Sequence, residues 1–180
     1  FPAELRQTAP TAAEYPTGVF TGSGSGTVEG TVVPVDINLV GDRASSSGCE
    51  PADFTGLDLS GAADIALIQR GTCNFGTKAQ NAELAGAEAV IVFNQGNSPD
   101  REPLVVADAS SLDDGTPVSH TIPVVGASFA NGEALAVGAR GSPSEFLLSG
   151  AAGDTATASG PTTRGDALRR FRDFLSRRDG

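Results

Sequence analysis

The segment Asp64–Asn97 constrains the fold of this chain most, because it places two short apolar runs on either side of a turn and a helix-like stretch. Apolar runs of four or five residues bounded by turn residues are typical of buried strands. The segment therefore predicts, in order, a buried strand at 65–68, a turn at 70–76 that carries Cys73, a helix at 77–85 and a second buried strand at 89–93.

The flanking segments add further strands and loops. Thr27–Asn38 is rich in β-branched residues that alternate with polar ones, which predicts a half-buried strand, and Pro34 predicts that this strand lies at an edge or beside a bulge. Thr77 and Gln80 fit a capping box for the predicted helix. Other elements are predicted as a polar loop at 95–119, a strand at 122–125, a helix capped by Ser128 that runs to about Val137, and a last strand at 146–148.

Composition limits the class of protein. The chain has 180 residues, of which 39% are hydrophobic, enough for one globular domain with a sizeable core. A formal net charge of -10 opposes nucleic-acid binding, which needs a basic surface. No apolar run approaches the roughly 18 residues that span a bilayer. Because the chain begins at Phe1 without methionine, we expect a mature product or a trimmed fragment.

Composition also divides the chain into expected units. The first is an N-terminal arm or linker at 1–16, and the second is a folded domain at 17–149. A linker rich in Gly, Ala, Ser and Thr is expected at 150–163, followed by a short basic amphipathic helix at 164–180.

The two cysteines, Cys49 and Cys73, leave alternatives open. In a reducing compartment they would be small buried hydrophobic residues, and in an oxidising one they can pair. Their spacing fits neither a C-x-x-C redox motif nor a zinc-binding pair. A disulfide closing this loop would stabilise the fold by roughly 3 kcal/mol on the chain-entropy argument.

Several motifs together resemble the protease-associated (PA) domain, a non-catalytic module of secreted and membrane peptidases and of sorting receptors. The strongest part lies within residues 65–97 and includes ALIQRGTCNF, KAQNAELAGAEAVIVFN and NQGN. The segments SGCEPADF (47–54) and IPVVGASF (122–129) support it, so the resemblance covers roughly 19–148. The chain looks most similar to the version in secreted bacterial zinc aminopeptidases of the aminopeptidase Y type.

This resemblance implies an α+β, mainly β fold, an open β-barrel or sandwich with short flanking helices. It also implies that Cys49 pairs with Cys73, and it carries over no catalytic residue and no cofactor. The implied role is accessory: shaping substrate access, binding a protein or peptide, or holding another domain of the peptidase.

The residues themselves argue against catalysis by this chain alone. A two-zinc peptidase site needs several histidine and acidic ligands, and the chain has one histidine, His120. We read His120 as a strand-edge residue beside Thr121 rather than the base of a serine triad. The loop acids Asp108, Asp113 and Asp114 lack the EF-hand pattern for calcium and are read as solvated charges.

A partner site is expected where the two buried strands end. If these strands are neighbours in a sheet, the turns that follow them lie on one rim, where amide groups and an arginine could hold a peptide backbone. The alternative is that these residues only satisfy their turns. The candidates for binding a peptide or partner are Arg70, Asn74, Phe75, Asn94, Gln95 and Asn97.

The function expected from the sequence is a non-catalytic accessory domain of a secreted bacterial peptidase, in contact with a peptide or protein substrate or with the peptidase catalytic domain. The alternative is a free-standing extracellular module that binds peptides or proteins. The expected localisation in both cases is extracellular, without a membrane span.

Overall fold

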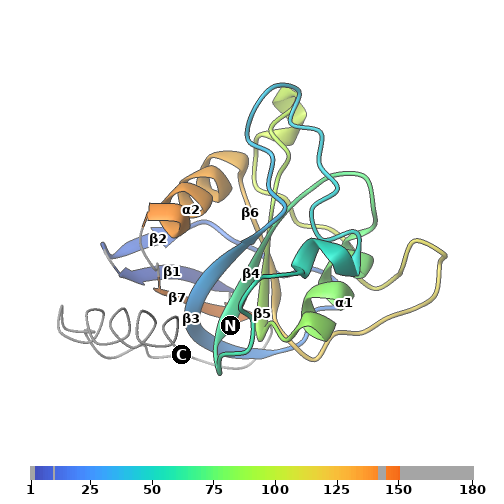
Figure 1. The fold of residues 1–180 in the computed structure, drawn as a ribbon, viewed down its shortest axis with the longest axis horizontal. Coiled ribbons are helices and arrows are strands. Elements are labelled where there is room, and N and C mark those ends of the chain that lie inside the picture. Colours follow the sequence, from blue (N-terminus) through green and yellow to red (C-terminus); the bar gives the residue numbers. More distant parts are fainter. Residues whose placement is uncertain (1–2, 10, 142–144, 151–180) are drawn as a thin grey trace, which may run out of the picture.

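The computed structural model of the chain describes residues 3–9, 11–141 and 145–150. Within these ranges, seven strands form one sheet in the order β2-β1-β7-β3-β4-β5-β6, which stays open at β2 and β6 (Figure 1). The strands are β1 Glu4–Ala9, β2 Ala13–Tyr15, β3 Gly26–Val35, β4 Asp64–Gln69, β5 Ala89–Phe93, β6 Val124–Ala127 and β7 Glu145–Gly150. The helices are α1 Phe75–Ala85 and α2 Phe129–Gly141, with 3-10 turns η1 Pro51–Phe54 and η2 Pro99–Arg101. The expected α+β, mainly β class with short flanking helices is confirmed.

The sheet has a parallel half and an antiparallel half. β3, β4, β5 and β6 are parallel neighbours, whereas β1, β2 and β7 pair in antiparallel fashion, and β7 joins the two halves by pairing with both β1 and β3. Parallel strands are usually covered on both faces, which explains the continuous apolar runs of β4 and β5.

Two apolar cores lie on the two faces of this sheet. Ile65 and Leu67 of β4 join the core that includes residues of α2, while Ala66 and Ile68 join the core that includes residues of α1. Alternate side chains of one strand point to opposite faces, so β4 contributes to both cores. Figure 1 shows α1 and α2 on opposite sides of the sheet. All five residues of β5 are buried as well.

The N-terminal segment differs from its expectation as an arm or linker. Residues 4–9 and 13–15 are strands β1 and β2, and β1 pairs with β7 through Leu5 and Leu148. Leu5 is buried in the core that includes α2. Local sequence did not reveal these strands, because they are short and largely polar and depend on a partner strand at the other end of the domain.

Two other local expectations also change. β3 lies inside the sheet, but its pairing with β7 ends at Thr31. Pro34 therefore has a neighbouring strand, β4, on one side only, and on the other side no described strand requires an amide hydrogen from it. Helix α1 begins two residues earlier than predicted, after Asn74, and Thr77 Oγ1 accepts a hydrogen bond from the Asp113 amide (3.0 Å) instead of capping the helix.

The remaining expected elements agree with the structure or lie outside it. Gly86 ends α1 in the left-handed conformation (φ 106°), and Ser128 Oγ caps α2 by accepting from the Asn131 amide (3.2 Å). Residues 95–119 form a long connection with only η2 and isolated bridges. Gly150, the first residue of the expected linker, is the last residue of β7, and the rest of that linker (to 163) and the basic helix expected at 164–180 lie outside the described residues.

Candidate functional site

The carboxyl ends of β4 and β5 meet at one edge of the sheet, which is the condition under which the two turns share a rim. The two strands are parallel neighbours with Gln69 opposite Phe93. Immediately after them, the Arg70 amide donates to the Phe93 carbonyl (2.8 Å), and Arg70 Nη1 lies 3.4 Å from Asn94 Oδ1. We call the turns 70–75 and 94–97 the rim.

Asn94 and Gln95 are buried, and their amide groups are already in use. Asn94 Nδ2 donates to the Pro103 carbonyl (2.8 Å), and Gln95 Nε2 donates to the Arg43 carbonyl (3.0 Å). Gln95 Oε1 accepts from Arg101 Nη1 (2.9 Å). These two candidates therefore hold neighbouring loops together, as in the alternative that the sequence left open.

Asn74 and Phe75 lie at the start of α1. The exposed Asn74 donates through Nδ2 to the Leu112 carbonyl (2.9 Å). The Phe75 ring packs edge-on against Phe20, with 5.1 Å between ring centroids, and the Arg70 guanidinium lies 5.8 Å above the Phe75 ring. Phe75 thus connects the rim to the apolar core, and Asn74 ties α1 to the long connection.

Arg70 and Asn97 remain as the rim candidates most open to a partner. Asn97 is exposed, and Arg70 is half-buried. Partial burial lowers the pKa of the Arg70 guanidinium, the nearby Arg101 charge lowers it further, and Asp100 acts in the opposite direction. A positive group held close to a second positive group is suited to receive an anionic or carbonyl acceptor from a partner.

Sequence reasoning missed Arg43, which joins the rim from the connection between β3 and β4. The Arg43 guanidinium stacks 4.0 Å above the Phe129 ring, donates to the Gly96 carbonyl and lies 3.4 Å from Glu102 Oε1. No local motif surrounds Arg43, so only the tertiary contacts reveal it.

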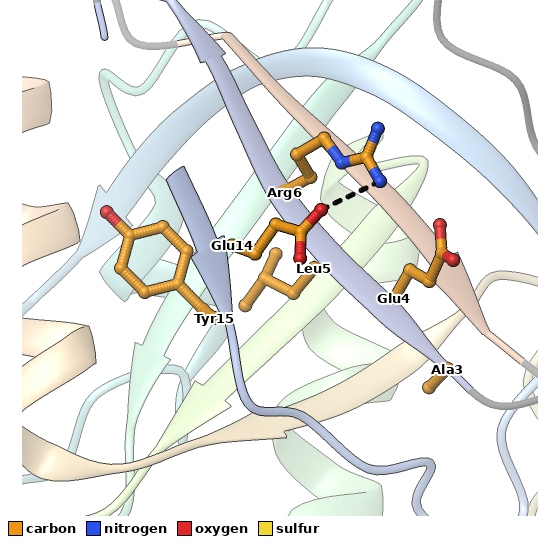
Figure 2. Close-up of a pocket in the computed structure, with 6 residues that line it drawn as sticks. All are labelled: Ala3, Glu4, Leu5, Arg6, Glu14 and Tyr15. Atoms are coloured by element: carbon orange, nitrogen blue, oxygen red, sulfur yellow. Dashed lines mark ion pairs between the residues drawn. The ribbon is translucent and has the colours of Figure 1, made fainter. Parts of the chain in front are cut away.

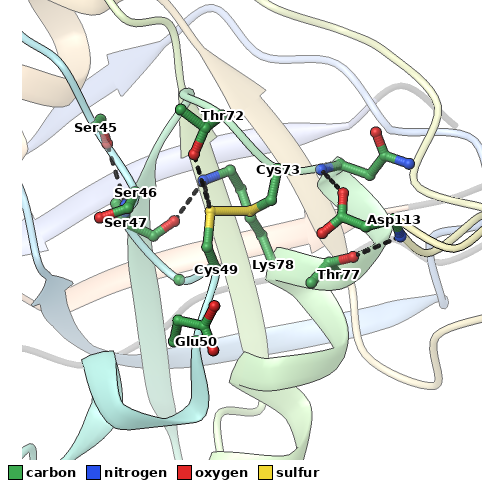
Figure 3. The surroundings of a disulfide bond; sticks show 12 residues. Ser45, Ser46, Ser47, Cys49, Glu50, Thr72, Cys73, Thr77, Lys78 and Asp113 are labelled. Carbon is green, nitrogen blue, oxygen red and sulfur yellow. Dashed lines mark hydrogen bonds between the residues drawn. A yellow bond between two sulfur atoms is a disulfide. The ribbon is translucent and has the colours of Figure 1, made fainter.

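The disulfide between Cys49 and Cys73 is present, with 5.7 Å between the two Cα atoms (Figure 3). The single lysine of the chain, Lys78, lies beside it and is completely buried. Lys78 Nζ donates to the Ser47 carbonyl and lies 3.5 Å from Cys49 Sγ. Burial lowers the pKa of Lys78 from 10.5 to about 8, against the opposing effect of nearby aspartates.

The buried ammonium should make stability depend on pH in the alkaline range. The lysine pKa is 10.5 in the unfolded chain and about 8 in the folded one, so between these values the unfolded state binds the proton more strongly. The free energy of unfolding should therefore rise by about 2 kcal/mol from roughly pH 8 to pH 10. Below this window both states are protonated and Lys78 adds no further pH dependence. Urea denaturation at four pH values measures the rise.

Lys78→Met is the control for this prediction, because methionine fills a similar volume without a charge. The alkaline rise should disappear in this variant, and a rise of unchanged size would contradict the assignment to Lys78. The measurement stops near pH 10 because burial raises the pKa of Tyr15, and loss of that proton reduces the free energy of unfolding at higher pH.

His120 is buried rather than at a strand edge. Its Nε2 lies 3.0 Å from the Ala109 carbonyl, and its Nδ1 lies 3.4 Å from Glu83 Oε2 on α1. The other oxygen of Glu83 accepts hydrogen bonds from the amide and hydroxyl of Thr121. His120 therefore helps connect α1 to the segment before β6.

Two of the three loop acids accept hydrogen bonds within their own turns, and the third, Asp113, accepts one from the start of α1. Asp108 Oδ1 accepts from the Ser110 amide (2.7 Å), Asp114 Oδ1 accepts from the Thr116 amide (2.9 Å), and Asp113 accepts from the amide of Asn74 (2.6 Å). Hydrogen bonds from the hydroxyl and the amide of Ser110 lower the pKa of Asp108, and hydrogen bonds from the amide and the hydroxyl of Thr116 lower the pKa of Asp114. Across the described ranges, no group of three or more histidine, cysteine or acidic side chains is arranged to hold a metal ion.

A cavity of about 160 Å³ lies away from the rim, at the β1–β2 end of the sheet (Figure 2). Its lining residues come from β1, β2 and the residue before β1: Ala3, Glu4, Leu5, Arg6, Glu14 and Tyr15. Arg6 and Glu14 form an ion pair there (3.0 Å), but both side chains are well exposed, so the pair adds little stability.

Comparison with known families decides the assignment. The PA domain family matches residues 28–135, which run from β3 through the rim and into α2. The chain belongs to the PA domain family. This PA domain includes the disulfide, Lys78 and the six predicted rim residues within the matched range.

Relatives of this PA domain include several peptidases. An aminopeptidase of Pseudomonas aeruginosa is 47% identical over 110 residues, which cover 61% of this chain and 19% of that protein. A probable leucine aminopeptidase 2 of Aspergillus fumigatus is 37% identical over 89 residues, or 49% of this chain and 16% of that protein. The chain thus spans less than a fifth of the length of these relatives.

Solved structures of aminopeptidases also superpose on most of this chain. The aminopeptidase of Aneurinibacillus sp. strain AM-1 superposes with a TM-score of 0.62 at 26% identity, covering 84% of this chain and 30% of that one. BSAP, a zinc aminopeptidase of Bacillus subtilis, superposes with a TM-score of 0.55 at 26% identity, covering 83% of this chain and 31% of that one.

Neither helix of the PA domain, over the residues described, has the length and hydropathy of a membrane span.

Proposed function

We propose that this PA domain is the accessory, non-catalytic part of a secreted bacterial zinc aminopeptidase. The observation that carries the proposal is the 47% identity to an aminopeptidase of which the chain covers 19%. The similarity to BSAP, a zinc aminopeptidase, supports the zinc-dependent class for the parent protein. The disulfide supports an oxidising, extracellular location.

The proposed role is contact with a polypeptide, either the substrate or the catalytic domain, through the exposed part of the rim. Arg70 and Asn97 supply donors there, while Asn94 and Gln95 hold the loops that position them. The Arg70 guanidinium lies 5.8 Å above the Phe75 ring and offers donors for backbone carbonyls or a carboxylate.

The first step is to determine the natural reading frame that contains this chain. We expect this frame to continue into a region rich in histidine and acidic metal ligands. That region is expressed as a separate chain, and its binding to the PA domain is measured by calorimetry beside binding of an unstructured peptide library. Binding of either partner supports the accessory role. A frame without such a region, together with peptide capture, would favour the free-standing binding module.

The rim itself is tested by the double variant Arg70→Ala with Asn97→Ala. If the rim makes the contact, affinity for the captured partner should fall at least tenfold, because two donors are lost. Arg6→Ala is the matched control, since Arg6 is a half-exposed arginine at the opposite end of the sheet and its removal should leave affinity unchanged. Equal affinities of the rim variant and the control would exclude the rim.

A further inference from the structure

The Cys49–Cys73 disulfide lies in an asymmetric distribution of charge. On the Cys49 side, the Lys78 ammonium is 3.5 Å from Sγ and the Thr72 hydroxyl is 3.7 Å from the same atom (Figure 3). Both groups can donate to a sulfur that carries negative charge. Lys78 is completely buried, so solvent does little to screen its charge.

Carboxylates lie on both sides of the bond. Asp53 Oδ2 accepts a hydrogen bond from the Glu50 amide, the first amide after Cys49 (3.1 Å). Asp113 accepts a hydrogen bond from the Asn74 amide, the first amide after Cys73 (2.6 Å), and the Asp113 amide donates to Thr77 Oγ1 (3.0 Å). Figure 3 shows Asp113 beside the start of α1, on the Cys73 side of the bond. A carboxylate therefore occupies the first amide after each cysteine, and the asymmetry of the bond comes from Lys78 and Thr72 beside Cys49 Sγ.

Thiol–disulfide exchange is sensitive to this asymmetry. A thiolate attacks one sulfur and the other leaves with the electron pair, and the leaving sulfur departs faster when its thiol has a low pKa. A neighbouring lysine lowers the pKa of a cysteine thiol. The bond should therefore break so that the charge develops on Cys49.

We propose that this disulfide is a directional thiol-exchange site, at which an external thiolate adds to Cys73 Sγ and Cys49 leaves as a thiolate held by Lys78. In this step the Cys49–Cys73 bond breaks, a bond forms between Cys73 and the thiol, and the electron pair passes to Cys49. A second thiolate can then attack the sulfur of the bound thiol, which releases a low-molecular-weight disulfide and reduces the pair by two electrons.

The surroundings keep Cys49 in place once the bond opens. Asn81 Nδ2 donates to the carbonyls of Gly48 (3.0 Å) and Cys49 (2.9 Å), and the Thr72 amide donates to the Ser45 carbonyl (3.1 Å). Neither contact involves a sulfur atom, so we expect both to persist after reduction. The Cys49 thiolate can therefore return to Cys73 and close the bond again, which makes the exchange reversible.

The experiment uses the folded 180-residue chain and glutathione as the thiol. After brief exposure to glutathione, the reaction is stopped with acid, free thiols are blocked with a maleimide, and peptide mass spectrometry locates both labels. Glutathione is expected on Cys73 and maleimide on Cys49, with at least a tenfold preference. Glutathione on Cys49, or equal labelling of both cysteines, would overturn the proposal.

Two variants distinguish the effect of the Lys78 charge from the effect of a looser loop around Cys49. Lys78→Met should open the bond roughly tenfold more slowly and lose the preference for Cys73, because the leaving thiolate has lost its cation. Asn81→Ala is the matched control: it frees the same loop without changing charge, so it should keep the preference and open at least as fast as the unmodified chain. Unchanged rate and preference in folded Lys78→Met would contradict the role of Lys78. Should this variant fail to fold, the labelling pattern of the unmodified chain still decides the proposal.

Discussion

Replacing Phe93 with alanine is expected to lower the free energy of unfolding by about 4 kcal/mol. Phe93 ends β5, is completely buried and packs against the Phe129 ring of α2, with 6.3 Å between ring centroids. It also fills the space above Gly132, where an added Cβ would lie 2.0 Å from the Phe93 ring. Truncation should therefore leave a cavity under α2. Chemical denaturation measures the loss, and Leu84→Ala, at a residue 78% exposed on α1, should change stability by less than about 0.5 kcal/mol.

A second substitution tests whether this close packing is the reason. Gly132→Ala alone should destabilise by about 1–3 kcal/mol, because its methyl group overlaps the Phe93 ring. In the Phe93→Ala background, the same change should be neutral or stabilising, since the methyl enters the cavity and alanine favours the helix. Additive effects of the two substitutions would mean that α2 does not rest on Phe93.

Removing the disulfide by Cys49→Ala with Cys73→Ala should lower the free energy of unfolding by about 3 kcal/mol. The bond joins residues 24 positions apart and so restricts the unfolded chain, while hydrogen bonds from Asn81 and Thr72 still hold the loop in the folded state. We therefore expect a less stable domain with an unchanged fold. Denaturation of the double variant, monitored together with near-ultraviolet circular dichroism, measures both properties.

The unmodified chain in excess dithiol is the matched comparison, because it lacks the bond but keeps both sulfur atoms. Its loss of stability should be close to that of the double variant. A loss below about 1 kcal/mol in both samples would show that the bond contributes little constraint, and loss of the near-ultraviolet signal would show that it is required for packing.

Only part of the hydrogen bonding at the rim could be predicted from the sequence. In the sequence, the pairing of β4 and β5 is only a condition for a shared rim, and the structure meets this condition and brings Arg70 to Asn94. That Asn94 and Gln95 bind internal carbonyls could not, because their partners Pro103 and Arg43 lie in separate loops. The sequence does not distinguish a hydrogen-bond donor that binds a partner from one that binds a neighbouring loop.

The sequence by itself determined the strand–turn–helix–strand unit of β4, α1 and β5, and with it the family, because run length and apolar composition encode local structure and burial. Only the tertiary structure decided how the outer strands join this unit, through pairing of β7 with both β1 and β3. It also decided the position of Lys78, whose ammonium is buried beside Cys49 Sγ at 3.5 Å. Such contacts depend on residues far apart along the chain, and no local pattern records them.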